Sequence, residues 1–119
     1  MKKFLLVLLV FSLLSAPSFA ATSREIADAH KADPAAAIKA YGWEEMEFTG
    51  TVESCELVYN DCARIWEIRI PVDGADIVGY TTRQLGTGAA VTMKGNCSGL
   101  RLVGDRVTIV LDNVQIAGQ

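Results

Sequence analysis

Trp66-Glu67-Ile68-Arg69-Ile70-Pro71-Val72 alternates apolar and polar side chains, and this stretch decides the fold class. Successive side chains of a β-strand point to opposite faces, so a period of two predicts a half-buried strand. A turn signal, Asp73-Gly74, ends the stretch, and the β-rich segment 77–82 follows it. The pattern therefore predicts two successive strands separated by a turn.

The same alternation recurs before and after these two strands. Segment 46–52 alternates small or apolar residues with polar ones, and segments 91–95 and 107–112 predict further strands. The last alternation resumes one residue out of step at Val114, unless a bulge lies near Asn113. Strand glycines (Gly50, Gly79 and Gly95) suit the sharp bends of a barrel.

Five short strands with regular turns predict a mainly β domain, a five-stranded OB-fold-like barrel over residues 45–119. An SH3-like barrel is the alternative. Residues 21–44 are predicted to form a short N-terminal helical segment. Thr22 and Glu25 have the spacing of a capping box, Asp33-Pro34 starts a second helix, and Gly42 suits its end.

Residues 1–20 have the three-part layout of a secretory signal peptide. The basic pair Lys2-Lys3 precedes an apolar run over 4–14, and small residues lead up to Ala20. We therefore expect cleavage after Ala20 and a periplasmic or secreted protein. A membrane-spanning helix needs about 20 apolar residues, so no membrane anchor is expected after cleavage.

Composition limits the classes of partner. The sequence holds 11 basic and 14 acidic residues, a net charge of −3. Loss of Lys2 and Lys3 with the leader would leave 9 basic residues against the same 14 acidic ones, a net charge of −5. An acidic chain repels phosphate backbones, and its arginines are scattered among acids, so nucleic acid is disfavoured as a partner.

Several short motifs resemble the tRNA_anti-like family of exported OB-fold domains. The motifs are Ala32-Asp33-Pro34-Ala35-Ala36-Ala37, Tyr41, Phe48-Thr49-Gly50-Thr51-Val52, and segments 91–99 and 110–116, which resemble the family's last two strands. The resemblance covers nearly the whole chain after the leader. It implies the OB-fold and, by analogy with anticodon-binding domains, nucleic-acid binding, although a fold does not fix a function.

The three cysteines are the most informative polar residues, because export would permit disulfides. Cys55 and Cys62 flank a turn signal at Asn60-Asp61, and a hairpin would set them across from each other, so we predict a Cys55–Cys62 bridge. Pairings with Cys97 stay open, since three connectivities are possible. Cys97 is expected either to be buried as a small apolar side chain or to link two molecules, which gives a monomer or a Cys97-linked dimer.

The sequence holds no pattern typical of an enzyme or a metal site. The only histidine, His30, is expected to be a solvated helix residue without an oriented partner. Glu44, Glu45 and Glu47 are interpreted as solvated, and Gly86-Thr87-Gly88 precedes a strand where a phosphate loop would precede a helix. The cysteine spacing fits no zinc finger. We expect no catalytic residue, no metal and no cofactor.

The predicted function is that of a non-enzymatic OB-fold module that binds a protein or an oligosaccharide. OB-folds bind ligands on strands two and three and the flanking loops, which points to Tyr59, Arg69, Tyr80 and Arg83 as ligand-binding residues. Four aromatic residues could stack on bases or sugars: Trp43, Tyr59, Trp66 and Tyr80. Of these, Trp66 and Tyr80 are expected in the core, and Tyr59 is the best candidate for an exposed contact. The alternatives are a single-stranded oligonucleotide-binding domain and a small hydrolase.

Overall fold

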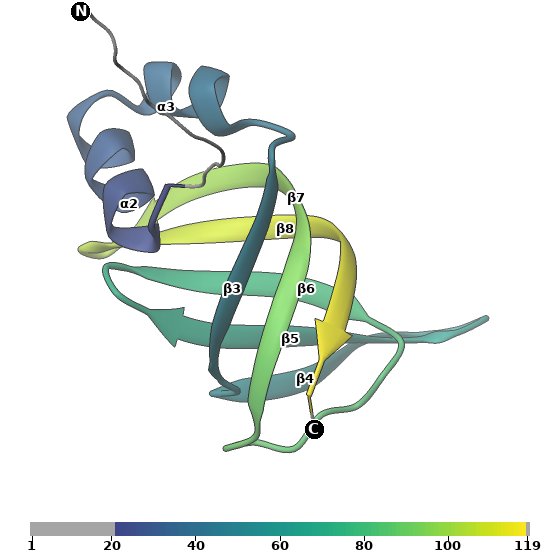
Figure 1. Ribbon diagram of the computed structural model, residues 1–119. Coiled ribbons are helices and arrows are strands. Elements are labelled where there is room, and N and C mark those ends of the chain that lie inside the picture. The colour runs from purple at the N-terminus through teal and green to yellow at the C-terminus, as the bar shows by residue number, and fades with distance from the viewer. Residues whose placement is uncertain (1–20, 119) are drawn as a thin grey trace, which may run out of the picture.

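Two short helices precede six strands in the computed structural model of the protein, which describes residues 21–118 (Figure 1). The helices are α2 (Ser23–Ala32) and α3 (Pro34–Tyr41). The strands are β3 (Glu45–Thr51), β4 (Ser54–Asn60), β5 (Arg64–Val72), β6 (Ala75–Thr81), β7 (Ala90–Val103) and β8 (Arg106–Ala117). The expected signal peptide, residues 1–20, lies outside the described residues.

The helical segment begins and breaks at the predicted residues. The Glu25 backbone N–H donates to the Thr22 hydroxyl at 3.1 Å, and the Thr22 N–H donates to the Glu25 carboxylate at 2.9 Å, which completes the capping box. Asp33 caps α3 by accepting a hydrogen bond from the Ala36 N–H at 3.2 Å. The predicted break near Asp33 is therefore confirmed.

All six strands belong to one mixed sheet in the order β3-β7-β8-β6-β5-β4. The pairing of β6 with β8 is parallel, and the other neighbours are antiparallel. The strand-rich class is confirmed. The predicted five-stranded barrel is wrong in strand number and in closure, because the described residues form six strands and no ladder joins the two edge strands, β3 and β4.

The additional strand arises where the first predicted strand changes partner. The Val52 N–H donates to the Ala89 carbonyl at 2.9 Å, which continues the pairing of β3 beside β7. The next residue, Glu53, donates to the Arg69 carbonyl at 2.9 Å, which begins the pairing of β4 with β5. One continuous segment therefore supplies both edges of the sheet.

The inner face of the sheet carries buried aliphatic side chains in rows. Ile70 of β5, Ile77 of β6 and Ile109 of β8 are opposite one another on adjacent strands, and Leu100 of β7 is opposite Ile109. All four side chains are buried in the same core cluster. The apolar positions of each alternation therefore become the core, as a period of two requires.

The strands β7 and β8 bend at a bulge. Their register shifts by one residue between segments 94–96 and 112–115, which places an extra residue of β8 opposite Gly95. Asn113 has a φ of 53°, a left-handed conformation in which asparagine is enriched. The bulge near Asn113 is confirmed, and beyond it Val114 packs against the core.

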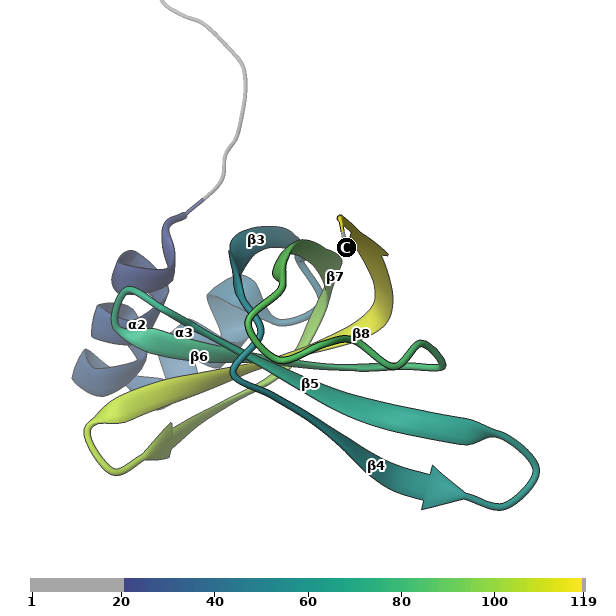
Figure 2. The same cartoon turned by 90° about the horizontal axis from the view of Figure 1, so that it is seen from below.

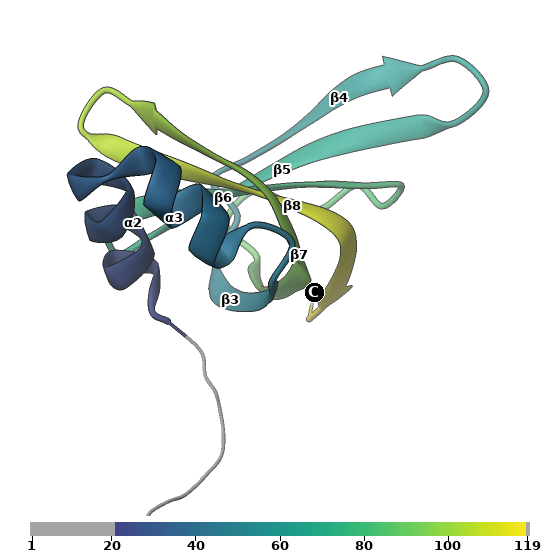
Figure 3. The same cartoon turned by 90° about the horizontal axis from the view of Figure 1, so that it is seen from above.

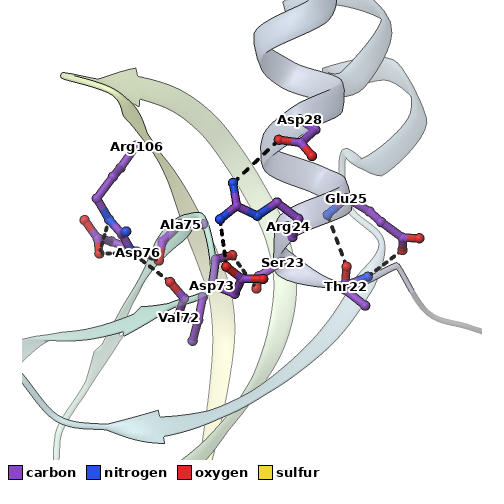
Figure 4. A network of polar contacts seen from close by, with 10 residues as sticks. All are labelled: Thr22, Ser23, Arg24, Glu25, Asp28, Val72, Asp73, Ala75, Asp76 and Arg106. Atoms are coloured by element: carbon purple, nitrogen blue, oxygen red, sulfur yellow. Dashed lines mark hydrogen bonds and ion pairs between the residues drawn. The ribbon is translucent and has the colours of Figure 1, made fainter.

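The helices lie at one end of the curved sheet, where α2 contacts β6, β7 and β8 (Figure 1). Polar contacts fix this arrangement at the β5–β6 turn (Figure 4). Arg24 forms a 2.8 Å ion pair with Asp73, and the Ser23 hydroxyl donates to the Asp73 carbonyl at 2.8 Å. On the other side of the turn, Arg106 donates to the carbonyls of Val72 and Ala75 at 2.7 and 2.6 Å.

His30 is buried on the face of α2 that packs on the sheet, together with Ile26 and Ala27. The prediction of a solvated histidine is therefore wrong, because residues one turn apart share the packed face of the helix. The imidazole is only 6% exposed, and its Nδ1 has no hydrogen-bond partner among residues 21–118. A buried polar atom without a partner destabilises the folded state.

Replacing His30 with leucine is expected to raise the free energy of unfolding by up to about 1 kcal/mol, because an apolar side chain removes the unpartnered atom. Urea denaturation of the two proteins under the same conditions measures the change. His30→Ala is the control, and its cavity should instead destabilise the protein. A clear loss of stability in His30→Leu would contradict this prediction, because it would show that the imidazole stabilises the folded state.

Candidate functional site

The outer face of β5 and β6 carries the polar half of the alternation that predicted these strands. Because Ile68, Ile70 and Ile77 point into the core, Glu67 and Arg69 of β5 and Asp76 and Tyr80 of β6 point outward. Glu67 lies directly opposite Tyr80. We call these four outward residues, Glu67, Arg69, Asp76 and Tyr80, the polar face.

Hydrogen bonds and ion pairs connect the side chains of the polar face. The Tyr80 hydroxyl donates to the Glu67 carboxylate at 3.0 Å. Asp76 pairs with Arg69 at 3.6 Å and with Arg106 of β8 at 3.2 Å. Partial burial, followed by the hydrogen bond and charge of Glu67, raises the pKa of Tyr80, while the positive charges of Arg101 and Arg69 oppose the shift.

The structure brings together only two of the four predicted ligand-binding residues. Arg69 and Tyr80 share the polar face, and Tyr80 is exposed there, so its expected place in the core is wrong. Trp66 packs partly buried against the core, as predicted. Tyr59 is exposed near the tip of the β4–β5 hairpin, as predicted. Arg83 lies beyond β6, where it donates to the carbonyl of Ile116 at 3.3 Å.

Two hairpins extend from opposite ends of the molecule (Figures 2 and 3). The β4–β5 hairpin exposes Leu57, Val58 and Tyr59. The β7–β8 hairpin exposes Leu102 and Val103 beside its turn. The polar face lies on strands between these two groups of exposed apolar side chains, which we call the hairpin tips.

The predicted Cys55–Cys62 bridge is wrong, because all three cysteines are free. The hairpin is longer than its sequence indicated. Cys55 lies opposite Ile68 within the strand and accepts a 3.3 Å hydrogen bond from the Leu85 N–H, whereas Cys62 is exposed beyond the end of β4. The two thiols therefore occupy different parts of the hairpin.

Cys97 is the buried cysteine, and its side chain is 1% exposed within the core cluster. Burial raises the pKa of its thiol, which keeps it in the neutral form. The prediction of a buried small apolar side chain is confirmed. A link between two molecules would need this thiol at the surface.

Trp43 is one of the aromatic residues that could stack on a ligand, although it was not among the four predicted ligand-binding residues. Its side chain is 67% exposed, and its φ is 66°, a conformation that bulky residues seldom adopt. It follows Gly42, which ends α3 with an ordinary φ of −57°. Glycine usually occupies the left-handed position just after the end of a helix, and here Trp43 occupies it. An aromatic residue directly after a helix-ending glycine was the only signal of this feature in the sequence.

The glutamates that precede and begin β3 lie at the surface of the molecule. Glu44, Glu45 and Glu47 are exposed, as predicted. Within residues 21–118, no three His, Cys, Asp or Glu side chains are grouped so that they could hold a metal ion. No helix in that range has the length and apolar character needed to cross a membrane.

Comparisons of the chain with protein-family models, with curated proteins and with solved structures found no match. The resemblance to the tRNA_anti-like family therefore stays a prediction. Function is inferred below from the geometry of the polar face and the hairpin tips.

Proposed function

We propose that the protein is an exported, non-enzymatic binding module that engages a protein partner along the polar face and both hairpin tips. One observation carries the proposal: exposed apolar side chains flank, at both ends, a face with a tyrosine and paired charges. Protein interfaces combine apolar and aromatic anchors with satisfied polar groups in this way.

The strand arrangement supports an OB-fold variant. If β3 and β4 are counted as one strand that changes partner at Val52 and Glu53, the chain has five strands. Strands two and three are then β5 and β6, and the loops that flank them are the β4–β5 and β7–β8 turns. These are the surfaces with which OB-folds bind their ligands.

Export is proposed from the leader. The basic pair Lys2-Lys3, the apolar run over 4–14 and the small residues before Ala20 support a cleaved signal peptide and a periplasmic or secreted location. After cleavage the chain would carry the net charge of −5 given above. That charge would favour a partner with a basic surface.

The side chains of this surface favour a protein over a sugar or a nucleic acid. Val58, Leu102 and Val103 are aliphatic, so they offer neither a ring for stacking nor a hydrogen bond for a hydroxyl group. Arg69 and Arg106 already pair with Asp76, which reduces the positive charge available to a phosphate. Apolar side chains of a protein partner match the hairpin tips best.

Placing a charge on either hairpin tip is expected to weaken partner binding about tenfold or more, because a charge there would be desolvated in the complex. The variants are Val58→Asp and Val103→Asp. The matched control is Ala35→Asp on the exposed surface of α3.

A photo-crosslinking residue at position 58 or 103 should capture the same protein in the native compartment, and the aspartate at the opposite tip should abolish this adduct.

Three results would contradict the proposal. Adducts of equal yield from position 35 would show nonspecific capture. Salt-sensitive binding of single-stranded oligonucleotides would favour the nucleic-acid alternative, since counterion release makes such binding fall with salt. Saturable binding of an oligosaccharide that depends on Tyr80, with no protein adduct at either tip, would favour a sugar ligand.

A further inference from the structure

We propose that a second binding site lies between the end of α3 and β7, and that it takes an aromatic ring carrying a carboxylate. A pocket of about 240 Å³ opens there. Its lining includes Ile38, Lys39, Trp43, Ser98, Gly99 and Leu100. None of these residues belongs to the polar face or the hairpin tips, so this site is independent of the function proposed above.

The backbone holds Trp43 at the rim of this pocket. Its N–H donates to the Cys97 carbonyl at 2.6 Å, and its carbonyl accepts from the Asn96 side-chain amide at 3.2 Å. The Cys97 N–H in turn donates to the Glu44 carbonyl at 2.9 Å. These bonds hold the backbone of Trp43 in the left-handed conformation, while its indole ring is exposed to solvent. Unfavourable backbone conformations of this kind cluster at functional sites.

The size of the pocket limits the ligand to a single ring. Pockets for drug-sized ligands have volumes of about 300–1,000 Å³, and this pocket is smaller. The exposed face of the Trp43 indole can stack on a flat ring, and Ile38 and Leu100 supply apolar contact. An aromatic ring with a short substituent matches these dimensions.

The polar groups of the pocket favour an anionic aromatic ligand over a sugar. Among residues 21–118, Lys39 is the only charged residue of the lining, so a carboxylate on the ligand finds a cation there and no acidic side chain from this range. The Ser98 hydroxyl already donates to the Val110 carbonyl at 3.3 Å. A sugar ring would bring several hydroxyl groups and find few free partners for them.

Gly99 lines the pocket, so a larger side chain there is expected to narrow the pocket without disturbing the core. A Cβ placed on Gly99 would meet no atom within 4 Å, so a larger side chain can grow into the open space. Gly86 is the matched control, because a Cβ there also meets nothing within 4 Å and the residue lies outside the pocket lining. The variants are Gly99→Leu and Gly86→Leu.

The test is a titration of the ¹⁵N-labelled protein, recovered after expression of the full chain, with 3-phenylpropionate. Saturable shifts of the Trp43 indole N–H and of the Ser98 and Gly99 amides are expected. Gly99→Leu and Trp43→Ala should each weaken binding at least about tenfold, and Gly86→Leu should leave it unchanged. The uncharged 3-phenylpropionamide and Lys39→Met should each weaken binding about twofold to fivefold, as for an exposed ion pair.

Glucuronate supplies the opposing case, a carboxylate on a sugar ring. Stronger binding of glucuronate than of 3-phenylpropionate would overturn the assignment of an aromatic ligand. Unchanged affinity in a folded Gly99→Leu variant, or in Trp43→Ala, would overturn the site. Equal affinity for the acid and the amide would overturn the role of Lys39. No saturable shift at any of these residues would also refute the proposal.

Discussion

Replacing Gly95 with alanine is expected to lower the free energy of unfolding by about 3 kcal/mol, at the upper end of the usual range for overpacking. A Cβ at this position would lie 2.6 Å from the Asp112 carbonyl oxygen and 3.1 Å from the Leu111 Cβ. The first of these is a backbone atom at the bulge between β7 and β8, so it cannot move aside by a change of rotamer. The bulge and the glycine therefore depend on each other.

The same strand supplies the control for this prediction. Gly99→Ala adds the same methyl group four residues further along β7, where it meets nothing within 4 Å, and its stability should change by no more than about 0.5 kcal/mol. Urea denaturation compares the two variants through their midpoints at an unchanged slope. If both variants lost the same free energy of unfolding, the loss would come from placing alanine in this strand and not from the contact of the Gly95 position with Asp112.

Truncating Ile77 to alanine is expected to cost about 2–5 kcal/mol, the range for large core side chains. Ile77 is fully buried at the centre of the isoleucine row, between Ile70 of β5 and Ile109 of β8. Its strand forms both the antiparallel ladder with β5 and the parallel ladder with β8. The sheet on both sides limits how far the cavity can collapse, so the loss should be near the upper end of the range.

Urea denaturation midpoints again measure the change in stability, and Ile77→Val serves as a second variant with a smaller truncation. The valine should cost about 0.5–1.5 kcal/mol, because it removes a single methylene. Leu102→Ala serves as the exposed control and should change stability by no more than about 0.5 kcal/mol. A loss in Ile77→Ala no larger than that in Leu102→Ala would contradict the placement of this row in the core.

Local chemistry predicted the elements whose signals are confined to a few neighbouring residues. The Thr22 capping box, the break at Asp33 and the inward isoleucines all follow from side-chain periodicity or hydrogen bonding over short spans. The bulge at Asn113 was predictable because the alternation resumes out of step there. The outward placement of Arg69 follows from the same period.

Features that depend on distant partners escaped prediction. The division into β3 and β4 depends on two strands that lie later in the chain, so the local pattern of segment 45–60 does not reveal it. The prediction of a Cys55–Cys62 bridge was wrong because the length and register of the hairpin depend on the whole ladder between β4 and β5. The burial of His30 depends on how α2 packs on the sheet, and the conformation of Trp43 depends on its hydrogen bond to Cys97 of β7.

The change of partner at Val52 and Glu53 also has consequences for folding kinetics. The segments β4, β5 and β6 follow one another closely and can pair as soon as they are made, whereas β3 needs β7, which begins at Ala90. Contacts between residues far apart in sequence close only after a large loss of chain entropy, and they slow folding. The β4–β5–β6 meander can therefore form first, whereas β3 can join the sheet only after β7 is in place.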